Sequence, residues 1–176
     1  MNNGRSVLIT GASRGIGAAI AKGFAREGYS FVGINYHSDE AGARAVAEEV
    51  RANGAHAEIY QADVSDSGDC QRLMEQFISD TGKIDVLINN AGGAQTIPAG
   101  SFAEMPVEYW DRQVRMNLSC AAYCSRIAIG DMLAKGTQGR IINISSVHSQ
   151  VTWVKRKALP YCAGKAGMNM FTKALG

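Results

Sequence analysis

The regular alternation of short apolar runs with longer segments of helical periodicity constrains the fold of this chain more than any other feature. The apolar runs predict strands at residues 6–10, 30–36, 55–61, 85–89 and 139–144. The segments between them predict helices at residues 15–27, 40–53, 66–81 and 106–134, and a last helix from residue 160 to the end. Near-continuous apolar strands between amphipathic helices are typical of a parallel sheet covered on both faces. We therefore expect an α/β fold, a doubly wound parallel sheet with at least five strands.

Composition and charge indicate an ordinary globular domain and exclude several classes of partner. The 176 residues suffice for one domain, expected to span residues 1–176, and 46% of them are hydrophobic. The net charge is +2 and the charges are interspersed, so we expect neither a nucleic-acid nor a membrane partner. One basic run, at residues 155–157, is interpreted as a solvated loop rather than a docking patch. No signal peptide precedes Ser6, and no apolar run approaches the length of a membrane span.

The cysteines predict a reduced protein without a metal centre. Cys120 and Cys124 are four residues apart on an expected helix, but no histidine lies nearby to complete a ligand set. Cys70 and Cys162 stand alone, and free cysteines are common in protein cores. We expect no metal and a cytoplasmic location.

A glycine-rich turn joins the first expected strand to the first expected helix. Its sequence, Thr-Gly-Ala-Ser-Arg-Gly-Ile-Gly at residues 10–17, places Gly11, Gly15 and Gly17 between a strand and a helix. In that context glycines let the backbone approach a pyrophosphate, and the helix N-terminus offers free N–H groups. The alternative is a glycine-rich turn without a ligand. Alone, the turn predicts only that the chain binds a nucleotide.

Two residues at the start of the last expected helix suggest acid–base chemistry. Tyr161 and Lys165 are four residues apart, which places both side chains on one face of the helix. A phenol titrates near ~10, and lowering its pKa by ~3 units requires ~4 kcal/mol of differential stabilisation. A close ammonium group favours the phenolate, so Tyr161 would serve as a general acid or base. Such pairs also occur by chance on helix surfaces.

A serine pair at the end of the fifth expected strand strengthens this interpretation. Ser145 and Ser146 stand where doubly wound folds build their sites, at the carboxyl ends of strands. A hydroxyl there can donate a hydrogen bond to a substrate carbonyl. Without Tyr161, a simple turn or helix cap would be the preferred interpretation.

Taken in order, these segments resemble the short-chain dehydrogenase/reductase family over the whole length of the chain. The matching segments are residues 10–17, Asp63-Val64, Asn89-Asn90-Ala91-Gly92, Asn117, Ser145-Ser146 and Tyr161-x-x-x-Lys165. The resemblance implies a Rossmann-like fold and an oxidoreductase that transfers a hydride between a nicotinamide cofactor and a carbonyl or alcohol.

The resemblance also assigns roles to residues. It implies a catalytic tetrad of Ser146, Tyr161, Lys165 and Asn117, with Ser146 preferred to Ser145 because the family usually uses the second serine. The turn would bind the cofactor, Asp63 and Val64 its adenine, and Asn90, Ala91 and Gly92 its ribose. The expected cofactor-binding residues are Gly11, Ser13, Arg14, Gly15, Ile16, Gly17, Tyr36, His37, Ser38, Asp63, Val64, Asn90, Ala91, Gly92, Tyr161 and Lys165. Fourteen residues separate Ser146 from Tyr161, more than is usual in the family, which puts the loop beside the substrate in doubt.

Cofactor preference follows from the end of the second expected strand. An acidic residue there binds the ribose of NAD. Here the position is held by Tyr36, followed by His37 and Ser38, and Arg14 can pair with a 2′-phosphate. We therefore expect NADP to be preferred over NAD. Asp39 lies close in sequence, and its negative charge argues against a bound 2′-phosphate. The alternative interpretation of Arg14 is an exposed side chain without a ligand.

Substrate identity is weakly constrained. The segment from Ile144 to His148, with Trp153, resembles bacterial glucose 1-dehydrogenases, whereas other parts resemble 3-oxoacyl carrier-protein reductases. We favour a 3-oxoacyl-type or general carbonyl reductase over a sugar or polyol dehydrogenase. His148 is interpreted as structural rather than as a sugar ligand.

Two other functions are compatible with this fold: a cofactor-binding relative without turnover, such as a redox-sensing regulator, and an interaction module without cofactor. Tyr161, Lys165 and the glycines argue against both. The chain ends near the helix that carries Tyr161, whereas family members continue further. We therefore expect the C-terminal strands of the family fold to be missing, and the chain alone to bind cofactor weakly and turn over slowly. A homo-oligomer is expected through the long helix and the final helix.

Overall fold

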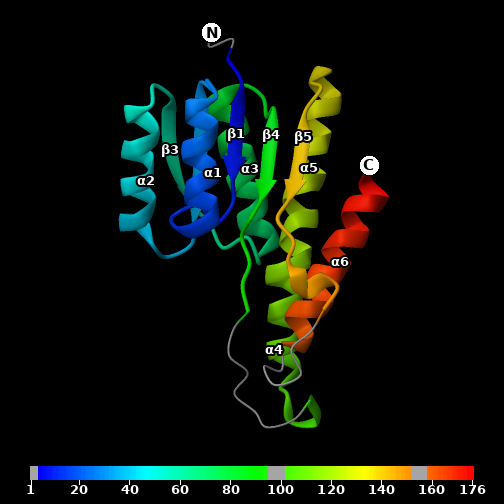
Figure 1. Ribbon diagram of the computed structural model, residues 1–176. Helices are drawn as coiled ribbons and strands as arrows, with labels where there is room; N and C mark the ends of the chain where they lie inside the picture. The colour runs from blue at the N-terminus through cyan, green and yellow to red at the C-terminus, as the bar shows by residue number, and fades with distance from the viewer. Residues whose placement is uncertain (1–3, 95–101, 152–157) are drawn as a thin grey trace.

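A computed structural model describes residues 4–94, 102–151 and 158–176. The basic run at residues 155–157 and Trp153, both interpreted above, lie outside these residues. Strands and helices alternate along the described chain (Figure 1). The strands are β1 (Ser6–Ile9), β2 (Phe31–Tyr36), β3 (His56–Gln61), β4 (Val86–Asn89) and β5 (Arg140–Asn143). The α-helices are α1 (Gly15–Arg26), α2 (Glu40–Ala52), α3 (Ser67–Thr81), α4 (Val107–Val114), α5 (Cys120–Lys135) and α6 (Leu159–Leu175).

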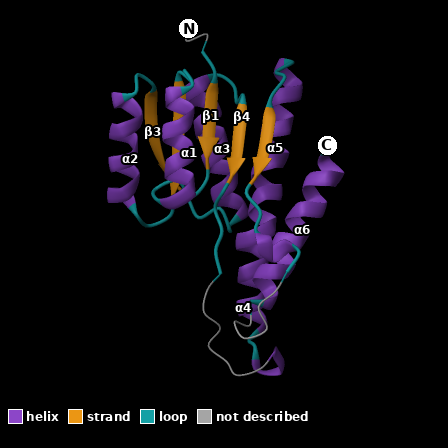
Figure 2. Ribbon diagram, in the orientation of Figure 1, coloured by secondary structure: helices purple, strands orange, loops and turns teal. Residues whose placement is uncertain are grey.

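All five strands are parallel, and their order in the sheet is β3-β2-β1-β4-β5. The chain moves outward in one direction from β1 to β3 and then returns to the other side of β1 with β4. The order therefore reverses between β1 and β4, and the carboxyl ends of the strands point to the same edge (Figure 2). In doubly wound sheets, ligands bind at this point of reversal. The predicted α/β doubly wound fold is confirmed.

Helices on the two faces of the sheet enclose two separate cores. Alternate strand residues point to opposite faces, so that Val7 and Ile9 join the core under α1 and α2, whereas Leu8 joins the core under α3 and α5. Every residue of β1, β2 and β4 is buried, which explains why these strands read as continuous apolar runs.

The long helix predicted at residues 106–134 is interrupted. Between α4 and α5 the backbone forms a π-helical turn, η2 (Arg115–Ser119), in which Cys120 N–H donates to the carbonyl of Arg115. Such turns frequently lie at functional sites. The sequence analysis did not predict this interruption, because the segment contains neither proline nor a cluster of turn residues. Short 3₁₀ turns occupy Phe102–Glu104 (η1) and Val147–Ser149 (η3).

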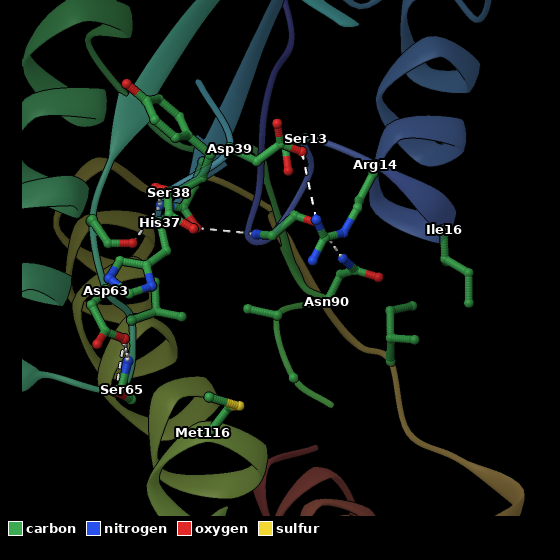
Figure 3. A pocket seen from close by; sticks show the side chains of 18 of the residues that line it. Ser13, Arg14, Ile16, His37, Ser38, Asp39, Asp63, Ser65, Asn90 and Met116 are labelled. Atoms are coloured by element: carbon green, nitrogen blue, oxygen red, sulfur yellow. Dashed lines mark hydrogen bonds and ion pairs between the residues drawn. The ribbon is translucent and has the colours of Figure 1, made fainter. Parts of the chain in front are cut away.

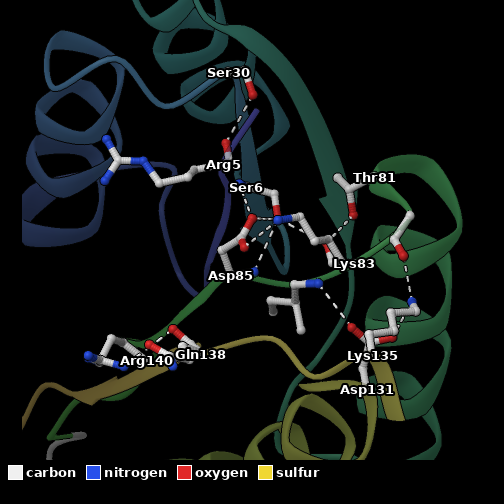
Figure 4. A network of polar contacts seen from close by, with 12 residues as sticks. Arg5, Ser6, Ser30, Thr81, Lys83, Asp85, Asp131, Lys135, Gln138 and Arg140 are labelled. Atoms are coloured by element: carbon white, nitrogen blue, oxygen red, sulfur yellow. Dashed lines mark hydrogen bonds and ion pairs between the residues drawn. The ribbon is translucent and has the colours of Figure 1, made fainter. Parts of the chain in front are cut away.

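A polar network ties the amino ends of β1 and β4 together (Figure 4). The carboxylate of Asp85 accepts hydrogen bonds from the backbone N–H of Ser6 at 2.8 Å and from Lys83 Nζ at 2.8 Å. The carboxylate of Asp131 accepts a hydrogen bond from the N–H of Ile84 at 3.0 Å, which joins α5 to the same corner. This network lies at the end of the sheet opposite the carboxyl ends of the strands and stabilises the fold there.

Candidate active site

The glycine-rich turn leaves the N-terminus of α1 open. Its N-cap residue, Arg14, makes no side-chain capping bond, and the first turn of α1 holds no carboxylate. Gly15 has a φ of +59°, and a Cβ atom there would meet nothing within 4 Å. By contrast, Asp39 caps α2 and Asp66 caps α3 through their side chains. The N–H groups of α1, with the positive end of its dipole, are thus free to bind an anion.

Close packing holds the turn against the end of β4. A Cβ atom on Gly17 would lie 2.5 Å from the Gly11 carbonyl oxygen and 2.6 Å from Asn90 Nδ2, so no larger residue fits there. Asn90 Nδ2 donates hydrogen bonds to the carbonyl oxygens of Thr10 at 2.9 Å and Gly11 at 3.0 Å. The hydroxyl of Thr10 accepts from the N–H groups of Asn90 and Ala91, both at 3.0 Å. The two strand ends at the point of reversal are therefore fixed to each other.

Asn35 holds the turn from the other side, and the sequence analysis missed it. Its Oδ1 accepts a hydrogen bond from the N–H of Gly11 at 3.1 Å, and its Nδ2 donates to the carbonyl oxygens of Tyr60 and Ala62, both at 3.2 Å. The side chain is buried. A polar residue inside an otherwise apolar strand was the signal that would have found it, because a buried amide needs partners.

One cavity of about 470 Å³ runs along the carboxyl ends of the strands (Figure 3). Fourteen of the predicted site residues line it: Gly11, Ser13, Arg14, Ile16, Tyr36, His37, Ser38, Asp63, Val64, Asn90, Ala91, Gly92, Tyr161 and Lys165. Further lining residues that the sequence analysis did not select are Asn35, Asp39, Ala62, Ser65, Met116, Ile144 and Ser145. Gly15 and Gly17 belong to the turn beside it, and Asn117 and Ser146 lie outside its lining.

Charged groups gather at the end of the cavity formed by β2 and β3. Arg14 lies 3.8 Å from the carboxylate of Asp39, and its side chain is 84% exposed. Burial acts to raise the pKa of Asp63, but hydrogen bonds from the hydroxyl and the backbone N–H of Ser65 outweigh it and lower that pKa. Asp63 therefore stays ionised and can accept hydrogen bonds from a ligand.

Lys165 enters the other end of the cavity from α6. Its Nζ donates a hydrogen bond of 2.8 Å to the carbonyl of Ile144 and lies 3.8 Å from the sulfur of Met168. Lys165 is 4% exposed, and this burial lowers the pKa of its ammonium group. Nζ also lies 3.2 Å from the point where a Cβ of residue 92 would stand, so Gly92 leaves space beside it.

Asn117 lies in the π turn, and both polar atoms of its side-chain amide are hydrogen-bonded. Its Oδ1 accepts from the N–H of Gly93 at 2.9 Å, and its Nδ2 donates to the carbonyls of Gln113 at 2.9 Å and Gly93 at 3.1 Å. The same Oδ1 lies 2.9 Å from the Cβ position of Gly92, next to the ammonium group of Lys165. Without the π turn, an asparagine in mid-helix would be unremarkable.

Ser145, Ser146 and His148 follow β5 in the chain and make different contacts. The ring of His148 packs edge-on against that of Tyr161, with centroids 6.0 Å apart. The hydroxyl of Ser145 donates to the carbonyl of Lys165 at 3.2 Å, whereas the hydroxyl of Ser146 accepts from the N–H of His148 at 3.2 Å and caps η3. The choice of Ser146 over Ser145 stays a prediction.

The described residues also show whether a helix could span a membrane and how the cysteines are placed. They include no helix with the length and hydropathy that a membrane span requires. Cys70, Cys120 and Cys124 are buried free thiols between α3 and α5, and burial raises the pKa of Cys120 to about 12.

Comparison with known proteins places the chain in a family. Residues 5–176 match the family model described as short chain dehydrogenase. Glucose 1-dehydrogenase 2 of Bacillus subtilis is 34% identical over 98% of this chain and 65% of its own length. The 3-oxoacyl-[acyl-carrier-protein] reductase FabG of Staphylococcus aureus is 37% identical over 97% of this chain and 66% of its own length. The chain thus spans about two thirds of the length of these relatives.

Solved structures agree in fold. Acetoin dehydrogenase from Enterobacter cloacae superposes with a TM-score of 0.90 at 34% identity, covering 99% of this chain and 67% of that chain. An NADH-dependent reductase responsible for alginate metabolism, complexed with NAD, gives 0.87 at 30% identity, covering 97% and 71%. A metagenomic short-chain oxidoreductase in complex with NADP gives 0.87 at 32% identity, covering 97% and 74%. With its glycine turn, its reversed strand order and its Tyr161–Lys165 helix, this chain belongs to the short-chain dehydrogenase/reductase family.

Proposed function

We propose that this protein is an oxidoreductase that transfers a hydride between NADP(H) and a carbonyl/alcohol substrate. The observation that carries the proposal is the continuity of one cavity, which joins the open N-terminus of α1 to Tyr161 and Lys165. A dinucleotide is long, and a cavity along the strand ends is where doubly wound folds bind one. The matched family and relatives named as dehydrogenases and reductases support the same reaction class.

The cavity residues fit a nicotinamide cofactor. The uncapped N–H groups of α1 would hold its pyrophosphate, Asp63 and Val64 its adenine, and Asn90, Ala91 and Gly92 a ribose. The open space at Gly15 and beside Gly92 leaves room for the close approach of a ligand. When bound, the cofactor supplies or accepts the hydride.

The chain's own residues would manage the proton. Tyr161 would exchange a proton with the substrate oxygen, and Lys165 would favour the phenolate and hold the nicotinamide ribose. Ser146 would donate a hydrogen bond to the substrate carbonyl. Asn117 would complete the tetrad by positioning water near Lys165, as the proximity of both side chains to Gly92 supports.

A preference for NADP(H) is part of the proposal. The guanidinium group of Arg14 stands at the cavity end next to Tyr36, His37 and Ser38, where a 2′-phosphate would lie. The negative charge of Asp39 opposes this preference. Asp39 also forms an ion pair with Arg14 at 3.8 Å, which keeps the guanidinium group at this end of the cavity. Relatives are complexed with either cofactor, so the affinities must be compared directly.

For the substrate we propose a 3-oxoacyl thioester or a general carbonyl compound, with a sugar or polyol as the alternative. The sequence identity is similar for a 3-oxoacyl reductase and for a glucose dehydrogenase, so both substrate classes must be tested. A panel of acyl thioester mimics, acetoin, aldoses and polyols, each with NADP(H) and NAD(H), tests the order. Turnover of aldoses alone would reverse it.

The same assays distinguish an enzyme from a cofactor-binding protein without activity and from an interaction module. Binding of reduced cofactor without turnover of any substrate would identify a cofactor-binding protein without activity. Absence of cofactor binding would identify an interaction module and overturn the proposal. A titration by the fluorescence of the reduced nicotinamide measures the first step independently of the second.

We also propose a cytoplasmic homo-oligomer. Large apolar side chains are exposed on α4, α5 and α6, namely Val107, Leu133 and Met170. These side chains lie on the long helical segment and on the final helix, through which the family resemblance implies that the chain associates. Light scattering of the protein and of Leu133→Asp tests this, because a charge in the interface would shift the protein to the monomer.

A further inference from the structure

One buried polar atom near the candidate site has no partner. Nε2 of Gln113 is the one buried side-chain nitrogen or oxygen in the described residues without a hydrogen bond. Gln113 itself is fully buried, on α4 directly before the π turn. Buried amide groups in proteins are almost always paired, because an unpaired N–H group costs free energy. This side chain therefore calls for a functional explanation.

The neighbouring Asn117 fixes the orientation of the Gln113 amide. Oε1 of Gln113 lies 3.4 Å from Nδ2 of Asn117, which also donates to the backbone carbonyl of Gln113 at 2.9 Å. The opposite orientation would place two N–H donors against each other. The oxygen of Gln113 thus faces Asn117, and its Nε2 faces away.

The location of Gln113 connects it to the site. Tyr109 and Gln113, the buried residues of α4, are four residues apart and share one face of the helix. Helix α4 packs against α6, the helix that carries Tyr161 and Lys165. Asn117, which is hydrogen-bonded to Gln113, also bonds to Gly93, and its Oδ1 lies next to the space beside Lys165.

We propose that Gln113 is a positioning residue that acts through Asn117, and that its Nε2 binds a buried water molecule. The side-chain oxygen and the backbone carbonyl of Gln113 hold the Asn117 amide in the π turn, and the water satisfies the remaining N–H groups. Ordered water is the usual partner of buried polar groups that no protein group satisfies. The inference rests on the proposed function, because it assigns Asn117 a part in the reaction.

A double-mutant cycle tests whether Gln113 acts through Asn117. The variants are Gln113→Met, which keeps the volume and loses the polar atoms, Asn117→Ala, and the two together. We expect Gln113→Met to lower kcat about tenfold with little change in the KM for cofactor, less than the ~10²-fold cost of a 1 Å misplacement. In the Asn117→Ala background the same change should lower kcat less than about twofold, since coupled residues are not additive.

Controls keep the outcome decisive. Gln76→Met makes the same chemical change on the exposed face of α3 and should leave kcat unchanged. Equal losses from Gln113→Met in both backgrounds would show a merely structural role and overturn the inference. Should Gln113→Met fail to fold, Gln113→Leu takes its place in the cycle, because it also removes the side-chain oxygen that accepts from Asn117.

A high-resolution crystal structure tests the water molecule without any need for turnover. We expect a water oxygen at hydrogen-bond distance from Nε2 of Gln113. A protein atom in that position, or no atom, would overturn this part. Asn117→Ala should lower kcat to a level that can still be measured, and an unchanged kcat would overturn the proposed part of Asn117 in the reaction, so failure of the function and failure of the inference give different results.

Discussion

The region around β1 and β2 and the region around β5 use the same strand–helix unit in different ways. Every residue of β1 and β2 is buried between the helices on the two faces of the sheet, whereas residues of β5 alternate between exposed and half-buried. Ile88 of β4 and Ile142 of β5 are partners in the sheet register and face the same side. Ile88 is 1% exposed and Ile142 is 44% exposed, because no described helix covers that face over β5.

The two regions also differ in how they place polar groups. The first region offers backbone N–H groups at an uncapped helix end, so it can bind a ligand with few functional side chains. The second buries the side chains of Gln113, Asn117 and Lys165 beside the cavity. Burying polar groups costs stability unless they are paired, and we propose that these three serve the reaction. Under the proposed function, the first region binds most of the cofactor and the second supplies the acid–base residues.

The largest expected effect comes from removing one oxygen atom, the hydroxyl of Tyr161. Tyr161→Phe should lower kcat by the ~10²–10⁴-fold that a general acid or base contributes, while cofactor affinity stays nearly unchanged. The ring still packs against His148, so the fold is preserved. Steady-state kinetics and a cofactor titration measure both quantities. Retention of more than about a tenth of the activity would contradict the assignment of Tyr161 as the acid–base group.

The next prediction compares the two registered isoleucines. Ile88→Ala should lower the free energy of unfolding by about 2–5 kcal/mol, because it leaves a cavity in a closed core. Ile142→Ala should cost less than half as much, since its side chain is already half in water. Urea denaturation of both variants measures the difference. Equal losses would mean that the β5 face is covered in solution, for instance by another copy of the protein.

A smaller effect is expected within the cofactor-binding region. Arg14→Ala should weaken NADP(H) binding about tenfold, or about 1.4 kcal/mol, and leave NAD(H) binding unchanged. The reason is the loss of a charge-assisted bond to the 2′-phosphate. Arg44→Ala, which removes an equal charge paired with Glu40 outside the cavity, is the matched control. Tighter binding of NAD(H) together with an inert Arg14→Ala would overturn the proposed preference.

The smallest effect concerns the titration of Asp63. Because its pKa is lower in the folded protein than in the unfolded chain, the ionised carboxylate stabilises the fold above the unfolded pKa, and this contribution is lost as the pH falls through the folded pKa. Ser65→Ala removes one of the two hydrogen bonds responsible, so the pKa of Asp63 should rise toward its ordinary value. Carboxyl NMR titration measures the shift, and an unchanged pKa would show that the backbone N–H of Ser65 suffices.

Much of the fold could be predicted from the sequence because its signals are local. Continuous apolar runs located all five strands to within one residue at most ends, and the glycine turn located the first crossover. Fourteen predicted site residues line the cavity, and they were selected from the local glycine pattern and from the resemblance to the family. Asn35 was missed because its partners, Gly11, Tyr60 and Ala62, are distant in sequence.

The sequence by itself determined the strand and helix pattern, the glycine turn and the four-residue spacing of Tyr161 and Lys165 on one helix, because each depends on residues a few positions apart. The tertiary structure alone decided the π turn at Asn117, the burial of Gln113 and Lys165, and the sulfur and carbonyl groups that surround Lys165 Nζ. These features depend on the packing of α6 against α4 and η2, which residue spacing does not encode. The physical reason is that burial and hydrogen-bond partners are set by which segments meet in space, whereas periodicity reports only the face that each segment presents.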